Sequence, residues 1–256
     1  MWDVNRGDEQ VANVVLFSMF MKEDPGTLQR KIGHLFSKAE HSEHDIRFLW
    51  VVGKVEGDDT TSMVISTIDT HRKKTKKSYP VEVVTASSPV SWNTELLRER
   101  LVRLSDHVRP GLECLKKEDD YLIIHESDLK SQDDIIDNLV SLSLERDGAI
   151  TAGWPVIKFR YHTEMFYDTW GYKKDGKNFS NDLSRPYPGY DGKVVELDSV
   201  GSVWCSPIYP FINSRSAWPY TNGAVEMCQG LKDMGLRIFA DPGLVIRQPV
   251  QSWQRW

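Results

Sequence analysis

Short apolar runs alternate with helical patterns between residues 11 and 159, and this alternation leaves few folds open to the chain. The runs over 11–20, 45–53, 81–86, 121–124 and 150–159 are rich in Val, Ile, Phe and Leu, as buried strands are. The first four are separated by segments with helix signals. Repeated strand–helix units with short connections predict an α/β fold with a mainly parallel central sheet flanked by helices.

The helix signals between these strands differ in strength. Asp24 followed by Pro25 is a strong start signal, because it supplies an N-cap carboxylate and a proline for the first turn. Further helices are predicted over 60–74 and 95–108. Ser131 is expected to cap a helix that follows the fourth strand.

Regular patterns fade between residues 160 and 195, where the chain is rich in Tyr, Gly, Asp and Asn. Such a long irregular stretch inside a compact domain is typical of a functional loop. Strand character returns over 194–211, a helix is expected over 224–235, and two strands joined by a turn are expected over 236–249. We therefore expect one domain with an irregular, aromatic-rich loop region in its C-terminal half.

Charge and hydropathy exclude several classes of protein. The chain has 32 Lys and Arg against 37 Asp and Glu, a net charge of −5, so its body is acidic. No apolar stretch is long enough to span a membrane, and the first ten residues are too polar for a signal peptide, so a soluble protein is expected. Three widely spaced cysteines make a disulfide scaffold unlikely to be the basis of the fold. Neither a GxGxxG nor a P-loop motif is present, which argues against classical dinucleotide folds and P-loop NTPases.

The fourth apolar run leads directly into the polar cluster His125-Glu126-Ser127-Asp128. If the strand continues through this cluster, Glu126 and Asp128 project to the same side. Two carboxylates at the carboxyl edge of a parallel sheet suit Mg²⁺ or Mn²⁺, and ligands bind at that edge in such folds. The alternative is a pair of solvated loop acids near a helix start.

Two other segments have possible binding roles. Aromatic rings and an interleaved carboxylate over 166–172 suit a sugar or a base, although ordinary packing is the alternative. A basic run could contact nucleic-acid phosphates, although an exposed loop is the alternative. This run contains five positive charges, from Arg72, Lys73, Lys74, Lys76 and Lys77.

The order of these features resembles the GT-A type of nucleotide-sugar glycosyltransferase. Within that type, the chain is most similar to the fungal mannan-polymerase-subunit family and its viral and bacterial relatives. The matching segments are YLIIHESDLK (121–130), FYDTWGYKKDGKNF (166–179), ELDSVGSVWCSPIYPF (196–211) and TNGAVEMCQGLKDMGLRIFADPGLVI (221–246). The resemblance covers nearly the whole chain. It implies a single GT-A-like domain, in which 1–130 form the nucleotide-binding half and 131–256 the sugar and acceptor half.

The resemblance also implies roles for individual residues. Asp128 corresponds to the last acid of the metal motif, and Glu126 replaces its usual first Asp. The resemblance also implies that the first strand contacts the nucleotide, and that later loops and strands contact the sugar, the acceptor or the phosphates. The residues implied for binding are Phe17, Ser18, Tyr167, Trp170, Asn222 and Arg247.

The chain departs from that family at two positions. Asn222 stands where the family often has an acid, and Arg247-Gln248 stand where a metal-binding His often follows the last strand. Arg247 could neutralise a phosphate directly. An inverting enzyme also needs a base beside the acceptor hydroxyl, and three acids are unranked candidates for this catalytic role: Asp168, Asp198 and Glu226.

The sequence therefore predicts a glycosyltransferase that uses Mn²⁺ or Mg²⁺ and a UDP- or GDP-sugar. Its acceptor is a hydroxyl of a glycan, or of a hydroxymethylated pyrimidine in DNA if the protein is a viral modification enzyme. A cytoplasmic protein is expected, in the host cytoplasm if it is viral, and a secretory lumen only if an N-terminal anchor has been removed. The competing class is a non-catalytic carbohydrate- or nucleic-acid-binding module, which would not need Glu126 and Asp128 as a pair.

Overall fold

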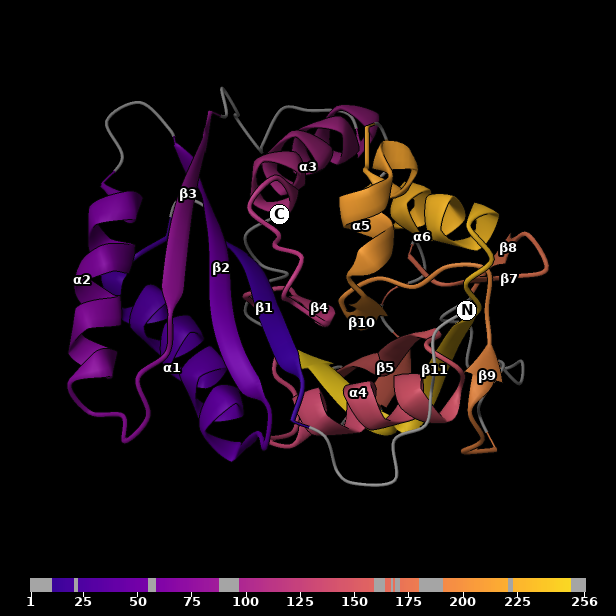
Figure 1. Cartoon of the computed structure of the whole chain (residues 1–256), viewed down its shortest axis with the longest axis horizontal. Coiled ribbons are helices and arrows are strands. Elements are labelled where there is room, and N and C mark those ends of the chain that lie inside the picture. The colour runs from indigo at the N-terminus through magenta and orange to yellow at the C-terminus, as the bar shows by residue number, and fades with distance from the viewer. Residues whose placement is uncertain are drawn as a thin grey trace.

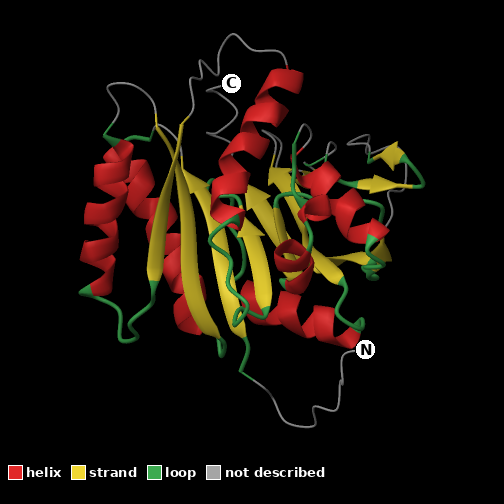
Figure 2. Cartoon of the chain, turned by 45° about the horizontal axis from the view of Figure 1, so that its top comes forward, coloured by secondary structure: helices red, strands yellow, loops and turns green. Residues whose placement is uncertain are grey.

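One central sheet organises the chain, with helices against both of its faces (Figures 1 and 2). The computed structural model describes residues 11–20, 23–54, 59–87, 97–158, 164–166, 168, 171–179, 191–220 and 223–249. Within these residues, no helix is both long and apolar enough to cross a membrane.

The first four strands are parallel and lie in the order β3-β2-β1-β4. Their bounds are β1 Asn13–Phe20, β2 Asp45–Lys54, β3 Val81–Ser87 and β4 Tyr121–His125. All four therefore end at the same edge of the sheet, which we call the carboxyl edge, and begin at the opposite, amino edge. The mainly parallel α/β sheet predicted from the sequence is confirmed.

The later strands extend the same sheet in the order β10-β5-β11-β9. Strand β10 (Val203–Pro207) runs antiparallel between β4 and β5 (Ile150–Lys158), and β11 (Ile238–Gln248) is parallel to β5. Short strands β6 (Glu164–Phe166) and β9 (Val195–Glu196) pair with β5 and β11. A separate hairpin consists of β7 (Lys173–Lys174) and β8 (Lys177–Asn178).

The two strands expected over 236–249 are one strand, β11, with an irregularity between Ala240 and Val245. Both sides of that irregularity pair with β5, so the predicted turn does not separate two strands.

Alternation along β1 directs apolar side chains to two cores. Val14 and Leu16 face the core covered by α1 (Pro25–His41), α2 (Thr60–Arg72) and α4 (Ile135–Glu145). Val15 and Phe17 face the core that includes residues of α3 (Leu97–Leu112), α5 (Tyr209–Asn213) and α6 (Gly223–Asp233). In Figure 1, α1 and α2 lie on one side of β1–β3 and α3 on the other. A strand buried on both faces explains why residues 14–17 are all apolar.

The predicted helix starts agree with the structure in one case and not in another. The Asp24 side chain accepts from the Thr27 N–H, so Asp24 is the N-cap of α1 as expected. The prediction that Ser131 caps a helix is wrong. Helix α4 begins at Ile135 after Asp134, because Ser131 is instead hydrogen-bonded to His34 and His125.

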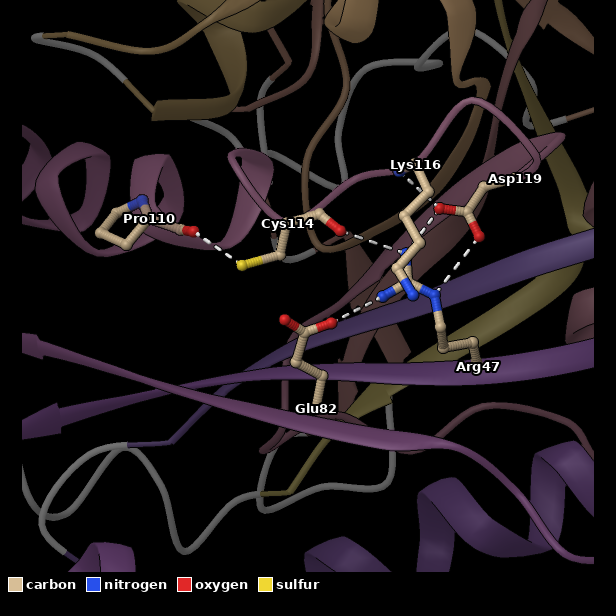
Figure 3. Close-up of polar contacts among 6 residues, drawn as sticks. All are labelled: Arg47, Glu82, Pro110, Cys114, Lys116 and Asp119. Atoms are coloured by element: carbon tan, nitrogen blue, oxygen red, sulfur yellow. Dashed lines mark hydrogen bonds and ion pairs between the residues drawn. The ribbon is translucent and has the colours of Figure 1, made fainter.

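Arg47 makes a network of ion pairs and hydrogen bonds at the amino edge of the sheet (Figure 3). Arg47 of β2 binds both carboxylate oxygens of Asp119, at 3.3 Å from Nε and 2.5 Å from Nη2, and its Nη1 lies 3.1 Å from Glu82 of β3. It also donates to the carbonyl of Cys114, whose thiol has a raised pKa because of burial and the nearby Glu82. This network ties β2, β3 and the segment before β4 together.

Candidate functional site

The candidate site lies at the carboxyl edge, where β4 ends between β1 and β10. Ser18 of β1 is buried, and its hydroxyl donates to the carbonyl of His125 over 2.6 Å. On the other side, His125 pairs with Val203 of β10. The chain that leaves β4 is therefore anchored to both neighbouring strands just before its first acid.

Glu126 and Asp128 lie in a turn rather than in the strand. Strand β4 ends at His125, and the Leu129 N–H donates to the Glu126 carbonyl over 3.2 Å. The expectation that strand alternation aligns these acids is therefore wrong. Burial raises the pKa of Glu126 well above its usual range, and the charge of Asp128 in the same turn raises it further.

The end of the last strand lies against this turn. Gln248 of β11 donates from Nε2 to Asp128 Oδ2 over 2.9 Å. Its neighbour Arg247 exchanges two backbone hydrogen bonds with Lys130, at 2.7 and 2.9 Å. The Arg247–Gln248 stretch therefore lies beside the turn that contains Asp128.

Asp168 joins the same group of acids. Its charge also raises the pKa of Glu126. Its two carboxylate oxygens accept hydrogen bonds, Oδ1 from the Gly171 N–H over 2.7 Å and Oδ2 from the Ser202 hydroxyl over 2.9 Å. Of the three acids considered for catalysis, Asp168 is the one whose charge acts on Glu126.

Two neutral histidines, His125 and His34, make hydrogen bonds to the turn after β4 and to Ser131, which follows it. His125 is 1% exposed; its Nδ1–H donates to the Glu126 carbonyl over 2.9 Å and its Nε2 accepts from the Ser131 hydroxyl over 3.0 Å. His34 of α1 accepts the Ser131 N–H at Nε2 over 3.2 Å. Burial lowers the pKa of His125 to about 4 and that of His34 to about 3, so both rings are neutral at pH 7.

Sequence reasoning missed this histidine pair. His34 carries no signal in the sequence that connects it with the fourth strand, because the contact depends on how α1 packs beside β4. His125 was expected to point away from the acids, and its ring does avoid their carboxylates while holding the Glu126 backbone.

Comparison with solved structures identifies the architecture. A structure of GalNAc-T7 with UDP, GalNAc and Mn²⁺ matches 94% of the chain with a TM-score of 0.58 and 11% identity. The chain spans only 44% of the length of that protein. A 4-diphosphocytidyl-2C-methyl-D-erythritol synthase from Anaerococcus prevotii matches 95% of the chain and 91% of its own length, with a TM-score of 0.50 and 10% identity. The fold is GT-A-like.

The sequence itself adds no family to this likeness. No protein-family model and no curated protein matches it. The narrower resemblance to the mannan-polymerase-subunit family therefore stays a prediction.

The other two catalytic candidates have different partners within the GT-A-like fold. Asp198 accepts from Lys232 Nζ over 2.8 Å and from the Gly176 N–H over 2.8 Å, and these two contacts hold its pKa below its usual range. Glu226, in the first turn of α6, accepts from the Tyr220 N–H over 2.5 Å.

Several predicted binding residues are core residues or lie outside the described part. Phe17 is fully buried in the core on the α3 side. Phe166 and Tyr172 are also buried, and both pack against Trp154 with ring centroids 4.9 and 6.1 Å away, so these two aromatics follow the packing alternative. Three further predicted residues lie outside the described residues: Tyr167, Trp170 and Asn222.

The basic run lies at the opposite, amino edge, because it connects the end of α2 to the start of β3. Arg72 donates to the Tyr79 carbonyl over 3.4 Å, and Lys77 donates to the Ser42 carbonyl over 3.2 Å. Lys77 and Arg47 line a cavity of about 510 Å³ at this edge. The remaining members are exposed: Lys73, Lys74 and Lys76.

The donor chemistry of the acid turn fits a divalent cation. The two charged groups that raise the pKa of Glu126 are both carboxylates. A bound cation would therefore offset the negative charge around Glu126. No cluster of three or more His, Cys, Asp or Glu side chains in the described ranges is arranged to hold a metal. Mg²⁺-type sites commonly use one or two carboxylates together with substrate phosphates and water, and the turn matches that kind of site.

Proposed function

We propose that this chain transfers a sugar from a nucleotide-diphosphate donor to a hydroxyl acceptor. The observation that carries the proposal is the position of Glu126 and Asp128 in the turn after β4, at the carboxyl edge of a GT-A-like sheet. Ligands of open α/β sheets bind at that edge. The likeness to GalNAc-T7, which was crystallised with UDP, GalNAc and Mn²⁺, supports the same reaction class.

Glu126 and Asp128 are the proposed holders of Mn²⁺ or Mg²⁺. When bound, the ion would stabilise the negative charge of the leaving diphosphate. Gln248 and the two histidines make hydrogen bonds to the turn and to the segment that follows it, so the carboxylates would be held in a fixed arrangement when the donor binds. Arg247, at the adjoining end of β11, is the proposed cation for a donor phosphate.

Asp168 is our choice among the three acids for a role at the reaction centre. Hydrogen bonds to both of its oxygens fix the orientation of the carboxylate. A fixed negative charge favours a sugar transition state with oxocarbenium character. Glu226 is kept as the candidate for the base, because the ion pair with Lys232 holds Asp198 in a structural contact.

For the acceptor, a glycan hydroxyl is favoured over a modified base in DNA. The basic run, which was the charged feature that pointed to DNA, lies at the amino edge, whereas the acids lie at the carboxyl edge. DNA bound along the run would therefore have to pass to the other end of the sheet to reach Glu126.

Nucleotidyl transfer is the second candidate function. It is favoured by the likeness to the erythritol synthase, because the chain covers 91% of that protein and only 44% of GalNAc-T7. The non-catalytic binding module stays the third alternative, and it predicts no turnover of any nucleotide.

A thermal-shift titration followed by an activity screen tests the proposal. We expect Mn²⁺ with UDP or GDP to raise the melting temperature of the wild type, and Asp128→Ala to remove this increase. The activity screen has two parts. In the first, nucleotide sugars are tested as donors with simple glycosides and with modified DNA as acceptors. In the second, CTP is tested with alcohol phosphates. Turnover of CTP alone would favour the second candidate. No metal-dependent shift and no turnover in the wild type would refute the donor site.

A further inference from the structure

Ser202 contacts two acids of the site at once. It directly precedes β10 and is only 3% exposed. Its hydroxyl donates to Asp168 Oδ2 over 2.9 Å, and its carbonyl accepts from the Glu126 N–H over 3.2 Å. One residue therefore joins Asp168 to the turn after β4.

The backbone of Ser202 is in an unusual conformation. Its φ is +64°, in the left-handed region that residues with a Cβ rarely adopt. Glycine would fit this backbone with less strain, but glycine has no hydroxyl. The residue thus combines an unfavourable backbone with a side chain that reaches Asp168.

Two glycines leave the space in which the Asp168 carboxylate lies. A Cβ on Gly201 would be 2.4 Å from Asp168 Oδ2, and a Cβ on Gly171 would be 2.6 Å from the same atom. Neither distance is possible without moving the carboxylate. Asp168 is therefore enclosed by two residues without side chains and hydrogen-bonded by a third.

We propose that Ser202 is a positioning residue of the site, whose hydroxyl holds the Asp168 carboxylate beside Glu126. This inference rests on the proposed function. Two neighbouring carboxylates repel each other and would move apart unless other groups hold them. Groups around a metal-binding residue that fix its orientation contribute to metal affinity without touching the metal. Ser202 acts on Glu126, a proposed metal holder, through its carbonyl, and on the neighbouring charge of Asp168 through its hydroxyl.

Ser199 provides a matched control in the same loop. It is 2% exposed, and its hydroxyl donates to the Gly171 carbonyl over 2.6 Å. It therefore also makes one buried hydrogen bond to the segment that carries Asp168. The difference is that Ser199 binds a backbone carbonyl, whereas Ser202 binds the carboxylate.

The test compares Ser202→Ala, Ser202→Gly and Ser199→Ala with the wild type. Each protein is titrated with MnCl₂ in the presence of saturating UDP, and the melting temperature is recorded. We expect the half-saturating Mn²⁺ concentration to rise about 10-fold in both Ser202 variants, at the lower end of the effect of residues around a metal site, because Asp168 neighbours the proposed ligand Glu126 without being a ligand itself. Ser199→Ala should stay within about twofold, because it leaves the carboxylate in place. Ser202→Gly also relieves the left-handed backbone, so it separates loss of the hydroxyl from poor folding.

A second comparison uses Asp168→Asn as the background. Ser202→Ala should raise the half-saturating concentration much less in this background than in the wild type, because the carboxylate it positions is absent. Equal effects in both backgrounds would overturn the inference.

The failures of the two proposals can be told apart. A wild type without any Mn²⁺-dependent shift refutes the proposed function, and with it this role of Ser202. A normal shift in the wild type with unchanged Ser202 variants refutes the role of Ser202 alone. An equal loss in Ser199→Ala and Ser202→Ala would show general loosening of the loop, which also contradicts the inference.

Discussion

Replacement of Arg47 by methionine tests how the amino edge of the sheet is stabilised. Methionine keeps much of the apolar stem but removes the guanidinium that binds Asp119 and Glu82. The side chain of Asp119 is only 6% exposed, so its carboxylate would remain largely buried without its cation. Removal of one partner from a buried ion pair costs about 3–5 kcal/mol.

The lower end of that range applies here for two reasons. Asp119 would keep a hydrogen bond from the Lys116 N–H at 2.8 Å, and the side chain of Glu82 is 42% exposed and so stabilises little. We therefore expect a loss of about 3 kcal/mol in the free energy of unfolding. For a chain of this length, that corresponds to a decrease of roughly 6–12 °C in melting temperature.

Urea unfolding at pH 7 measures this change, with two comparisons. Arg47→Met combined with Asp119→Asn should recover much of the loss, because the uncompensated charge is gone. Arg237 makes a similar two-bond contact with Glu196, at 2.8 and 2.7 Å, but both side chains are exposed. Arg237→Met should therefore change the urea midpoint far less.

Two results would refute this reasoning. One is a loss for Arg47→Met no larger than that for Arg237→Met. The other is a double variant as unstable as Arg47→Met alone, which would mean that the burial of an unpaired Asp119 charge is not the cause.

Two further predictions concern packing and pH. A Cβ on Gly111 of α3 would lie 2.3 Å from the Phe17 ring and 2.8 Å from Val51, so Gly111→Ala should lower stability by about 1–3 kcal/mol in urea unfolding. Unchanged stability would show that α3 can move away from β1. His34 has a folded pKa of about 3 against about 6.5 when unfolded, so its stabilising contribution is complete above pH 6.5 and is lost as pH falls toward 3. Urea unfolding at pH 7 and pH 5 should therefore show a smaller loss for His34→Gln than for the wild type, and equal losses would contradict the neutral, buried state of the ring.

Most of the helix and strand assignments could be predicted, because their signals are local. The run over 11–20 is apolar at eight of its ten residues, and β1 is buried on both faces. Asp24 and Pro25 start α1 through contacts within four residues. Boundaries were less predictable where distant groups compete, as at Ser131, whose partners are the histidines His34 and His125.

The candidate site was predictable only in part. Glu126 and Asp128 were predicted as site residues because a strand ends just before them, and strand ends mark the binding edge of such sheets. Strand alternation does not apply to the turn in which they lie. Ser202 was not found, because neither its left-handed backbone nor its two acidic partners leaves a pattern in neighbouring residues.

The sequence by itself determined the α/β class, most of the elements and the edge at which the acids lie, since periodicity and strand order depend on residues close together in the chain. The tertiary structure alone decided which groups meet there. Gln248 reaches Asp128 from 120 residues away, and Asp168 reaches Glu126 because β10 inserts between β4 and β5 and brings Ser202 with it. Such contacts depend on the packing of the whole sheet and its helices, and no local pattern of residues encodes them.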